Sequence, residues 1–295
     1  MGKATRIRQQ NAREKIAAQR AAERRAEQRR RLFITGGSVL AVIAIVVAFI
    51  VVKSMSSPAT PPNAAARTPL PASVAKNVTS VPPSTLAAVG KGSVITSTPP
   101  VTKVTGPALT SNGKPEMLYI GAEYCPYCAA MRWSMAVALS RFGTLSTPLH
   151  GVHSASNDAF PNTATLTFYK SGYDSKYLTF TPVENLTVDR SLLQSPTAQQ
   201  NQIWARYEPD ATQRGYPFID IGNKYVIKGP IYDPAVLKGL TWSQIAADLH
   251  NPSSPVAQGV LGAANYITAA ICQTTNNQPA SVCTAPSIIK VAGGL

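Results

Sequence analysis

Cys125 and Cys128 are the residues whose types and spacing most directly predict chemistry in this sequence. Two thiols separated by two residues can interconvert between a dithiol and an intramolecular disulfide. In such an exchange the first thiolate forms a mixed disulfide with a substrate, and the second thiol resolves it and releases the product. The spacing therefore predicts thiol–disulfide exchange, with Cys125 as the nucleophile and Cys128 as the resolving thiol.

The residues on either side of the two thiols predict a buried strand followed by a helix. The run EMLYIG, which begins at Glu116, is apolar and contains aromatic and β-branched residues, as is typical of a strand. Pro126 is well suited to the first turn of a helix, and apolar residues then recur at helical spacing until Gly143. Cys125 is therefore expected at a helix N-terminus, where the helix dipole and unpaired N–H groups lower a thiol pKa.

A second segment, downstream, has the pattern of a hairpin and a helix. Pro217 precedes an apolar run at 218–221, Gly222 and Asn223 predict a tight turn, and 225–228 returns as the partner strand. Thr241 is suited to cap the helix that follows.

Together the two segments resemble the thioredoxin superfamily. The string GAEYCPYC after a buried strand is similar to its active-site segment, and a Pro-Tyr pair between the cysteines is the one found in glutaredoxins. The resemblance implies that Pro217 follows a cis peptide bond, faces the cysteines and lets the backbone of Tyr216 pair with a substrate. Tyr216, Pro217, Tyr127 and Pro126 are our candidate substrate-binding residues. The alternative is that Pro217 only begins an edge strand.

Positive charge is concentrated at the N-terminus. Of a formal net charge of +14 over 295 residues, residues 1–31 hold +8, with eleven Lys or Arg and three Glu. Residues 32–52 are uncharged and mostly apolar, and 21 residues suffice to cross a hydrocarbon core of about 30 Å. The positive-inside rule then places the N-terminus in the cytoplasm and the C-terminal domain outside. A cleaved signal peptide is the alternative. The basic tail has no aromatic side chain to stack on bases, which argues against nucleic acid as a partner.

Residues 53–108 contain ten prolines among Ala, Ser, Thr and Val, which predicts an extended linker, with a helical turn at 84–94 that docks on the domain. The thioredoxin-like domain is expected at 109–295. The 88 residues between Cys128 and Pro217 exceed the roughly 30 residues that a whole βαβ unit occupies, so we expect an insertion at about 144–210. The predicted fold class is α/β, a thioredoxin-like fold with this insertion, preceded by one transmembrane helix and the linker. Within the insertion we expect strands at 148–154, 163–170 and 177–184 and a helix at 195–207 that begins at Pro196.

Two positions depart from the thioredoxin pattern. Small thioredoxins keep a buried acid beneath the two cysteines, whereas this sequence has Tyr119 at the corresponding place, so that proton relay is not implied here. Glu123 lies two residues before Cys125, and we expect it to be a solvated carboxylate at the end of a strand. The alternative is that Glu123 takes the place of the buried acid.

Cys272 and Cys283 follow an additional C-terminal helix that we expect at about 253–272. The ten residues between them include enough turn-forming residues to bring the two sulfurs together, and we expect a structural disulfide outside the cytoplasm. The alternatives are a relay of electrons to Cys125 and Cys128, or a zinc site made of all four thiols. His150 and His153 would point to opposite faces of a strand, and no metal or cofactor is predicted.

From Lys114 to about Cys283 the chain also resembles an uncharacterised prokaryotic family of membrane-anchored thioredoxin-like proteins. The strings YIGAEYCPYC, PNTATLTFY, KYLTFTPVE, DIGNKYV and WSQIA carry this resemblance. It implies a fold and a location, and leaves the activity open.

These observations lead to one functional hypothesis and its alternatives. We expect a single-pass membrane protein whose outer domain exchanges disulfides with cysteines of exported proteins and with a redox partner in the membrane or envelope. The alternatives are a non-catalytic thioredoxin-fold module that binds a soft metal such as Cu(I), and a scaffold of the cell envelope.

Overall fold

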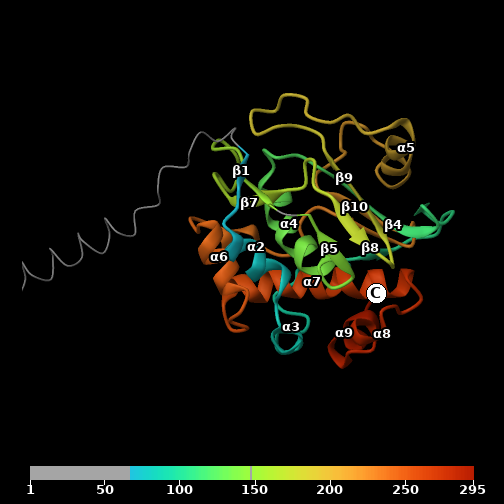
Figure 1. Cartoon of the computed structure of the whole chain (residues 1–295). Helices are drawn as coiled ribbons and strands as arrows, with labels where there is room; N and C mark the ends of the chain where they lie inside the picture. Colours follow the sequence, from blue (N-terminus) through green and yellow to red (C-terminus); the bar gives the residue numbers. More distant parts are fainter. Residues whose placement is uncertain (1–66, 147) are drawn as a thin grey trace, which may run out of the picture. The chain divides into compact units, whose positions relative to one another are not determined.

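The computed structural model of the chain describes residues 67–146 and 148–295 (Figure 1). The basic tail at 1–31, the predicted transmembrane helix at 32–52 and the linker up to residue 66 lie outside these ranges. A search of the described residues finds no helix with the length and hydropathy needed to cross a bilayer.

The central sheet is mixed and places β4 (Lys114–Gly121) in its interior. On one side β4 pairs in parallel with β9 (Thr179–Glu184). On the other side it pairs antiparallel with β10 (Phe218–Ile221), which turns back into β11 (Tyr225–Lys228). Two short strands extend this sheet, β2 (Thr102–Lys103) beside β11 and β3 (Thr110–Ser111) beside the start of β4. The architecture is α/β, as the sequence predicts.

The predicted hairpin at 218–228 is confirmed residue by residue. Gly222 and Asn223 are the central residues of the turn, with φ values of 65° and 57°, both in the left-handed region that a type I′ turn requires. Lys224 completes the three-residue loop between the paired residues Ile221 and Tyr225. The side chain of Asp220 accepts a hydrogen bond from the Asn223 N–H at 2.6 Å and so stabilises the turn.

Helices cover both faces of the central sheet. α4 (Pro126–Leu139) and α7 (Pro255–Thr274) pack on the face that carries Met117 and Tyr119 of β4. α5 (Ala198–Tyr207) covers the opposite face, where Ile203 and Trp204 meet alternate residues of β4 and β10. Strands that are buried on both faces are apolar at every position, which explains why the run in β4 is continuous rather than alternating.

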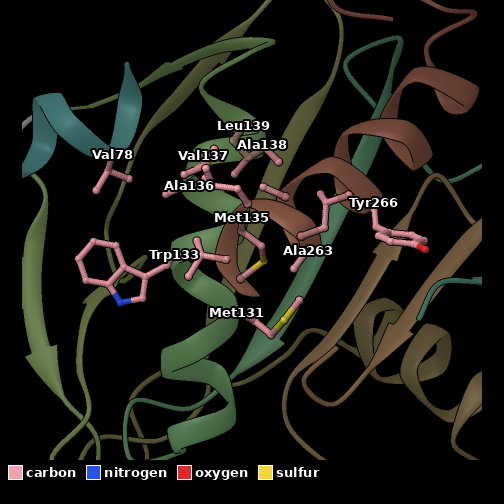
Figure 2. Close-up of a cluster of buried hydrophobic side chains, with 14 of the residues drawn as sticks. Val78, Met131, Trp133, Met135, Ala136, Val137, Ala138, Leu139, Ala263 and Tyr266 are labelled. Atoms are coloured by element: carbon pink, nitrogen blue, oxygen red, sulfur yellow. The ribbon is translucent and has the colours of Figure 1, made fainter. Parts of the chain in front are cut away.

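The helix that begins with the CxxC motif, α4, is buried on nearly its whole circumference, since it lies between the sheet, α7 and β7 (Ala164–Thr167). In Figure 2 Met131 and Met135 lie toward Ala263 of α7, and Trp133 lies on the other side beside Val78. A helix that is apolar all round is stable only when it is enclosed in this way. The start of α4 is therefore held in place by packing along the entire helix.

The segment predicted as an insertion is only partly one. Between α4 and β9 the chain forms four short strands, of which β6 and β7 join β1 (Thr68–Pro69) in a three-stranded sheet and β5 pairs with β8. They are β5 (Gly143–Leu145), β6 (His150–His153), β7 and β8 (Tyr173–Ser175). β9 and α5, which we also assigned to the insertion, belong to the central sheet and its covering helix, so the predicted span of 144–210 is too long.

The predicted extended linker is wrong from residue 67 onward, although the docked helical turn that we expected within it at 84–94 is confirmed by a helix at 83–89. α2 (Ala72–Thr79) and α3 (Pro83–Val89) lie in this range, and both bury side chains such as Val78 and Leu86 in the main core. Three of the prolines that suggested an extended chain, Pro71, Pro82 and Pro83, stand at the starts of these helices, where a missing N–H costs nothing. The folded unit thus begins well before the predicted boundary at 109.

The C-terminal part continues with five helical segments after β11. They are η1 (Pro234–Leu237), α6 (Trp242–Asp248), α7, α8 (Ala280–Cys283) and α9 (Pro286–Ala292). Thr241 caps α6 and Ser254 caps α7, close to the predicted positions. α5 starts later than expected, because Thr197 rather than Pro196 leads into it and forms a capping box with Gln200.

Candidate active site

Cys125 is the N-cap residue of α4, and Pro126 occupies the first helical position, as the sequence predicts. The backbone N–H of Cys128 donates a hydrogen bond to Sγ of Cys125 at 3.3 Å. The sulfur thus takes the place of the side-chain oxygen that usually satisfies one of the free N–H groups at a helix start. Cys128 lies one turn further along the helix.

Both thiols are free and buried, with 4% of Cys125 and 0% of Cys128 exposed. A hydrogen bond from the Cys128 thiol lowers the pKa of Cys125, and the backbone N–H of Cys128 and the charge of Arg132 act in the same direction. Burial raises the pKa of Cys128 well above its usual range, and the charge and hydrogen bonding of Cys125 raise it further. Cys125 is therefore the thiol that ionises more readily. Cys128 keeps its proton and donates it in a hydrogen bond to the Cys125 sulfur.

Tyr216 lies directly against Cys125, although the two are 91 residues apart in sequence. The peptide bond between Tyr216 and Pro217 is cis, and the Cys125 thiol donates a hydrogen bond to the carbonyl oxygen of Tyr216 at 3.7 Å. The structure thus brings together the cysteines and the Tyr-Pro pair at the ends of α4 and β10.

Aromatic side chains surround the thiols. The ring of Tyr216 packs on Tyr124 with 6.3 Å between centroids and on Trp204 with 5.4 Å. Tyr127 packs on Phe160 at 5.9 Å, whereas Pro126 is buried at the start of α4. Trp133, which shares the sequence neighbourhood, is instead a core residue whose indole N–H donates to the Ala164 carbonyl.

We use the term aromatic surface for the rings of Tyr124, Tyr127 and Tyr216 around the thiols. Two residues that pack on it, Phe160 and Arg190, were not predicted from the sequence. The guanidinium of Arg190 lies 4.5 Å from the ring centre of Tyr124 and is paired with Asp158. Both residues lie in segments whose patterns predict only strands and loops, so no local signal identified them. Their proximity to the thiols arises from the way the chain folds between α4 and α5.

A fully buried ion pair between Arg132 and Glu184 was also not predicted. Arg132 Nε and Nη2 lie 2.9 and 2.7 Å from the two carboxylate oxygens, and Nη2 also donates to the Ala122 carbonyl. Arg132 is four residues after Cys128 and therefore lies on the same face of α4. The sequence feature that could have pointed to this ion pair is the single arginine within an otherwise apolar helix.

Glu123 is not the solvated carboxylate that the sequence predicts. It is 1% exposed and accepts hydrogen bonds from Arg67 and from the hydroxyl of Thr167. Arg67 falls in the segment predicted as linker. Local sequence patterns therefore could not indicate that Glu123 has an ion-pair partner.

Cys272 and Cys283 are joined in a disulfide with 5.5 Å between their Cα atoms. Thr274, two residues after Cys272, packs against Gly222 at the end of β10 that is remote from Pro217. The two cysteine pairs therefore lie toward opposite ends of this strand. Within the described residues, no three His, Cys, Asp or Glu side chains cluster closely enough to hold a metal ion.

Comparison with protein families gives one match, to a domain of unknown function (DUF929), over residues 100–273. The chain belongs to the DUF929 family. The DUF929 match includes Cys125, Cys128, Tyr216 and Pro217, so the site described above lies inside the family domain. Comparisons of this DUF929 chain with curated proteins and with solved structures found no match.

Proposed function

We propose that this protein is a thiol–disulfide oxidoreductase that acts on cysteines of exported proteins through Cys125 and Cys128. The observation that carries the proposal is the hydrogen bonding at the N-terminus of α4, where the Cys128 N–H and thiol both favour the thiolate of Cys125. A thiolate at a helix start is the reactive form in exchange chemistry. Its partner thiol is three residues away, a separation at which an intramolecular disulfide can form.

The fold supports this proposal. The strand order β9-β4-β10-β11, with β9 parallel to β4 and the other pairs antiparallel, resembles the core of the thioredoxin fold. α4 follows β4 directly, and α5 connects β9 to β10 on the other face, as in that fold. The Tyr216–Pro217 pair precedes β10 at the position that faces the CxxC motif in the superfamily. Fold alone does not assign activity, so the geometry of the thiols carries the argument.

The exchange with a substrate disulfide takes two steps. The Cys125 thiolate attacks one substrate sulfur, the Cys125–substrate disulfide forms, and the other substrate sulfur leaves as a thiolate. Cys128 then attacks Sγ of Cys125, the Cys125–Cys128 disulfide forms, and the second substrate thiolate leaves. Two electrons pass from the protein to the substrate, and protons from the two thiols end on the substrate sulfurs. The reverse sequence oxidises a substrate dithiol, and the reduction potential decides the direction.

The aromatic surface around Cys125 supports a polypeptide substrate. Tyr124, Tyr127 and Tyr216 are each partly exposed next to a buried sulfur, so an approaching chain contacts rings before it reaches the thiol. Large amphipathic rings provide contact area without a charge requirement. We therefore propose that Tyr216, Pro217, Tyr127 and Pro126 contact the substrate segment on either side of its cysteine.

We further propose that the domain is anchored outside the cytoplasm by the apolar segment at 32–52. The charge distribution of the sequence supports this location, as does a disulfide between Cys272 and Cys283, since disulfides persist in oxidising compartments. Protease treatment of intact host spheroplasts that express the full chain tests the topology. Digestion of the domain without cell lysis is expected, and protection of the domain until lysis contradicts the proposal.

The activity is tested with the purified full chain in mild detergent, by following its reaction with glutathione disulfide. The wild type and the Cys272→Ala/Cys283→Ala control are expected to release two equivalents of glutathione. Cys125→Ser is expected to release none, and Cys128→Ser to stop at the mixed disulfide with one. Release that persists in Cys125→Ser refutes the proposal. Stoichiometric Cu(I) binding by Cys125 and Cys128 with no exchange in the wild type would favour the metal-binding alternative instead.

A further inference from the structure

Two buried polar atoms near Cys128 have no hydrogen-bond partner among the described residues: the hydroxyl of Tyr119 and Nη1 of Arg132. Both side chains are fully buried. A buried polar group without a partner is costly, and such groups in a native fold call for an explanation. Because the two atoms belong to side chains that converge on one thiol, we sought that explanation at the thiol.

Arg132 is fixed so that only Nη1 remains free. Its Nε and Nη2 bind Glu184, and Nη2 also binds the carbonyl of Ala122, the residue that follows β4 on the way to Cys125. Glu184 is itself held by the Phe168 N–H at 3.1 Å. Residues four apart on a helix have Cβ atoms roughly 5–6 Å from each other, so the guanidinium lies one turn below the Cys128 thiol.

Tyr119 approaches the same place from the sheet. Its ring lies edge-on to Phe168, and its hydroxyl lies over Gly121, so close that any side chain at position 121 would collide with it. Glycine at 121 is thus what allows the hydroxyl to reach the end of β4. Ala122, the next residue, packs with Cys128 in one buried cluster, so the hydroxyl lies close to the thiol. In agreement, the Cys128 thiol is among the groups that raise the pKa of Tyr119, after burial.

The charged and titratable groups that face Cys128 come from every element around it. They are Cys125 and Arg132 on α4, Tyr119 on β4, Tyr124 in the following loop, Glu184 on β9 and Tyr216 before β10. Within this set the positive charge of Arg132 and the negative charge of Glu184 balance. The N–H group on Nη1 of Arg132 and the O–H group of Tyr119 nevertheless have no hydrogen-bond acceptor among the described residues. Surplus donors next to a thiol favour its thiolate over its neutral form.

We propose that Tyr119 and Arg132 are positioning residues for the second step of exchange, in which their free O–H and N–H groups bind the thiolate of Cys128. The inference rests on the proposed function. In the free dithiol Cys128 gives its proton in a hydrogen bond to Cys125. Once Cys125 is in a mixed disulfide, its sulfur no longer carries the negative charge that accepts this hydrogen bond. Cys128 must then lose its proton while it remains buried. Its proton passes to water before the attack, and the departing substrate thiolate takes up a proton from water after the Cys125–Cys128 bond has formed.

Tyr119→Phe is the sharpest test, because it removes a hydroxyl that has no partner and leaves the packing of the ring unchanged. Reduced full-length protein is mixed with glutathione disulfide, quenched with acid at successive times, and the mixed disulfide is quantified by mass spectrometry over a pH series. We expect unchanged formation of the mixed disulfide at Cys125 and about 10- to 100-fold slower resolution at neutral pH, the effect of losing a hydrogen bond to a charged group. The pH midpoint of resolution is expected to rise.

Tyr232→Phe is the matched control, since that buried hydroxyl donates to the Ala130 carbonyl on the same helix and has no part in the proposal. It is expected to lower stability while the pH midpoint of resolution stays at the wild-type value. Arg132→Lys keeps the charge but replaces the three guanidinium nitrogens by one ammonium, which Glu184 occupies, so no donor is left for Cys128 and resolution is expected to slow as in Tyr119→Phe. A wild-type rate and midpoint of resolution in either variant overturns the role of that residue. Failure of the wild type to form the mixed disulfide refutes the proposed function, a separate outcome.

Discussion

Arg67 and Glu123 form a two-point ion pair in which Nε and Nη2 of the arginine each lie 2.7 Å from a carboxylate oxygen. Arg67 immediately precedes β1, whereas Glu123 lies two residues before Cys125. Thr167 in β7 donates a further hydrogen bond to the same carboxylate. The loop that leads from β4 into the CxxC helix is therefore fixed to the N-terminal segment and to the three-stranded sheet at once.

Removing one partner of this ion pair is expected to be costly. Arg67→Met leaves the carboxylate of Glu123 buried with a single hydrogen bond, and we expect the free energy of unfolding to fall by about 3 kcal/mol. Arg67→Met/Glu123→Gln, which buries no charge, is expected to regain most of the loss. Denaturant unfolding of the full chain measures both. Arg190→Met is the control, because its ion pair with Asp158 is solvated, with 42% of the arginine side chain exposed. Equal losses in the two arginine variants contradict the prediction.

The same contact shows why part of the fold escaped prediction from sequence. Local patterns identified the strand and helix around Cys125 and the turn at Gly222, since turn residues and helix-start prolines act within a few residues. Arg67 and Glu123 are 56 residues apart, and Arg132 and Glu184 are 52 apart, so their pairing is set by tertiary packing alone. Composition was misleading for α2, because Pro71 is compatible both with an extended linker and with a helix start, whereas the apolar residues of 84–94 did predict a docked helical turn where α3 lies.

Cys128→Ala is expected to make Cys125 less reactive at neutral pH. The hydrogen bond from the Cys128 thiol is the largest of the causes that lower the pKa of Cys125 from its ordinary value of 9.0. Without that donor the pKa of Cys125 rises, the thiolate fraction at neutral pH falls, and the pH profile of alkylation by iodoacetamide shifts to higher pH. The alkylation rate of Cys125, followed by mass spectrometry, measures the shift.

The control for this experiment is Ser134→Ala, a substitution of similar size on the same buried helix. It is expected to leave the alkylation profile of Cys125 at the wild-type position. A profile in Cys128→Ala that coincides with the wild type, or moves to lower pH, shows that the second thiol does not stabilise the first thiolate.

Asp220 is expected to make stability depend on pH. Burial raises the pKa of its carboxyl from 3.8 to about 6, and one of its oxygens has no hydrogen-bond partner among the described residues. Because the folded-state pKa is the higher one, the stabilising contribution of the neutral carboxyl is complete below about pH 4 and is lost as the pH rises through about 6. Asp220→Asn cannot ionise and is expected to exceed the wild type in stability by at most about 3 kcal/mol at pH 8.

Denaturant unfolding of the full chain at several pH values measures this difference. The gain from Asp220→Asn is expected to grow between about pH 4 and 6 and to level off above about 7. Asp174→Asn, at an exposed position in β8, is the control and is expected to show no such rise. A gain that is equal at pH 4 and pH 8 would show that the amide, rather than the loss of ionisation, is responsible.

Cys272→Ala/Cys283→Ala separates a structural disulfide from a relay. The bond closes a loop of 11 residues, and its loss is expected to lower the free energy of unfolding by about 3 kcal/mol. The pair lies toward the end of β10 that is remote from Pro217, so we expect the alkylation rate of Cys125 and the release of glutathione to remain at wild-type values. Unfolding of oxidised wild type and of the double variant measures the first effect, and the exchange assay measures the second. A variant that keeps wild-type stability but loses exchange would instead show that electrons pass between the two cysteine pairs, which requires a rearrangement that brings opposite ends of the sheet together.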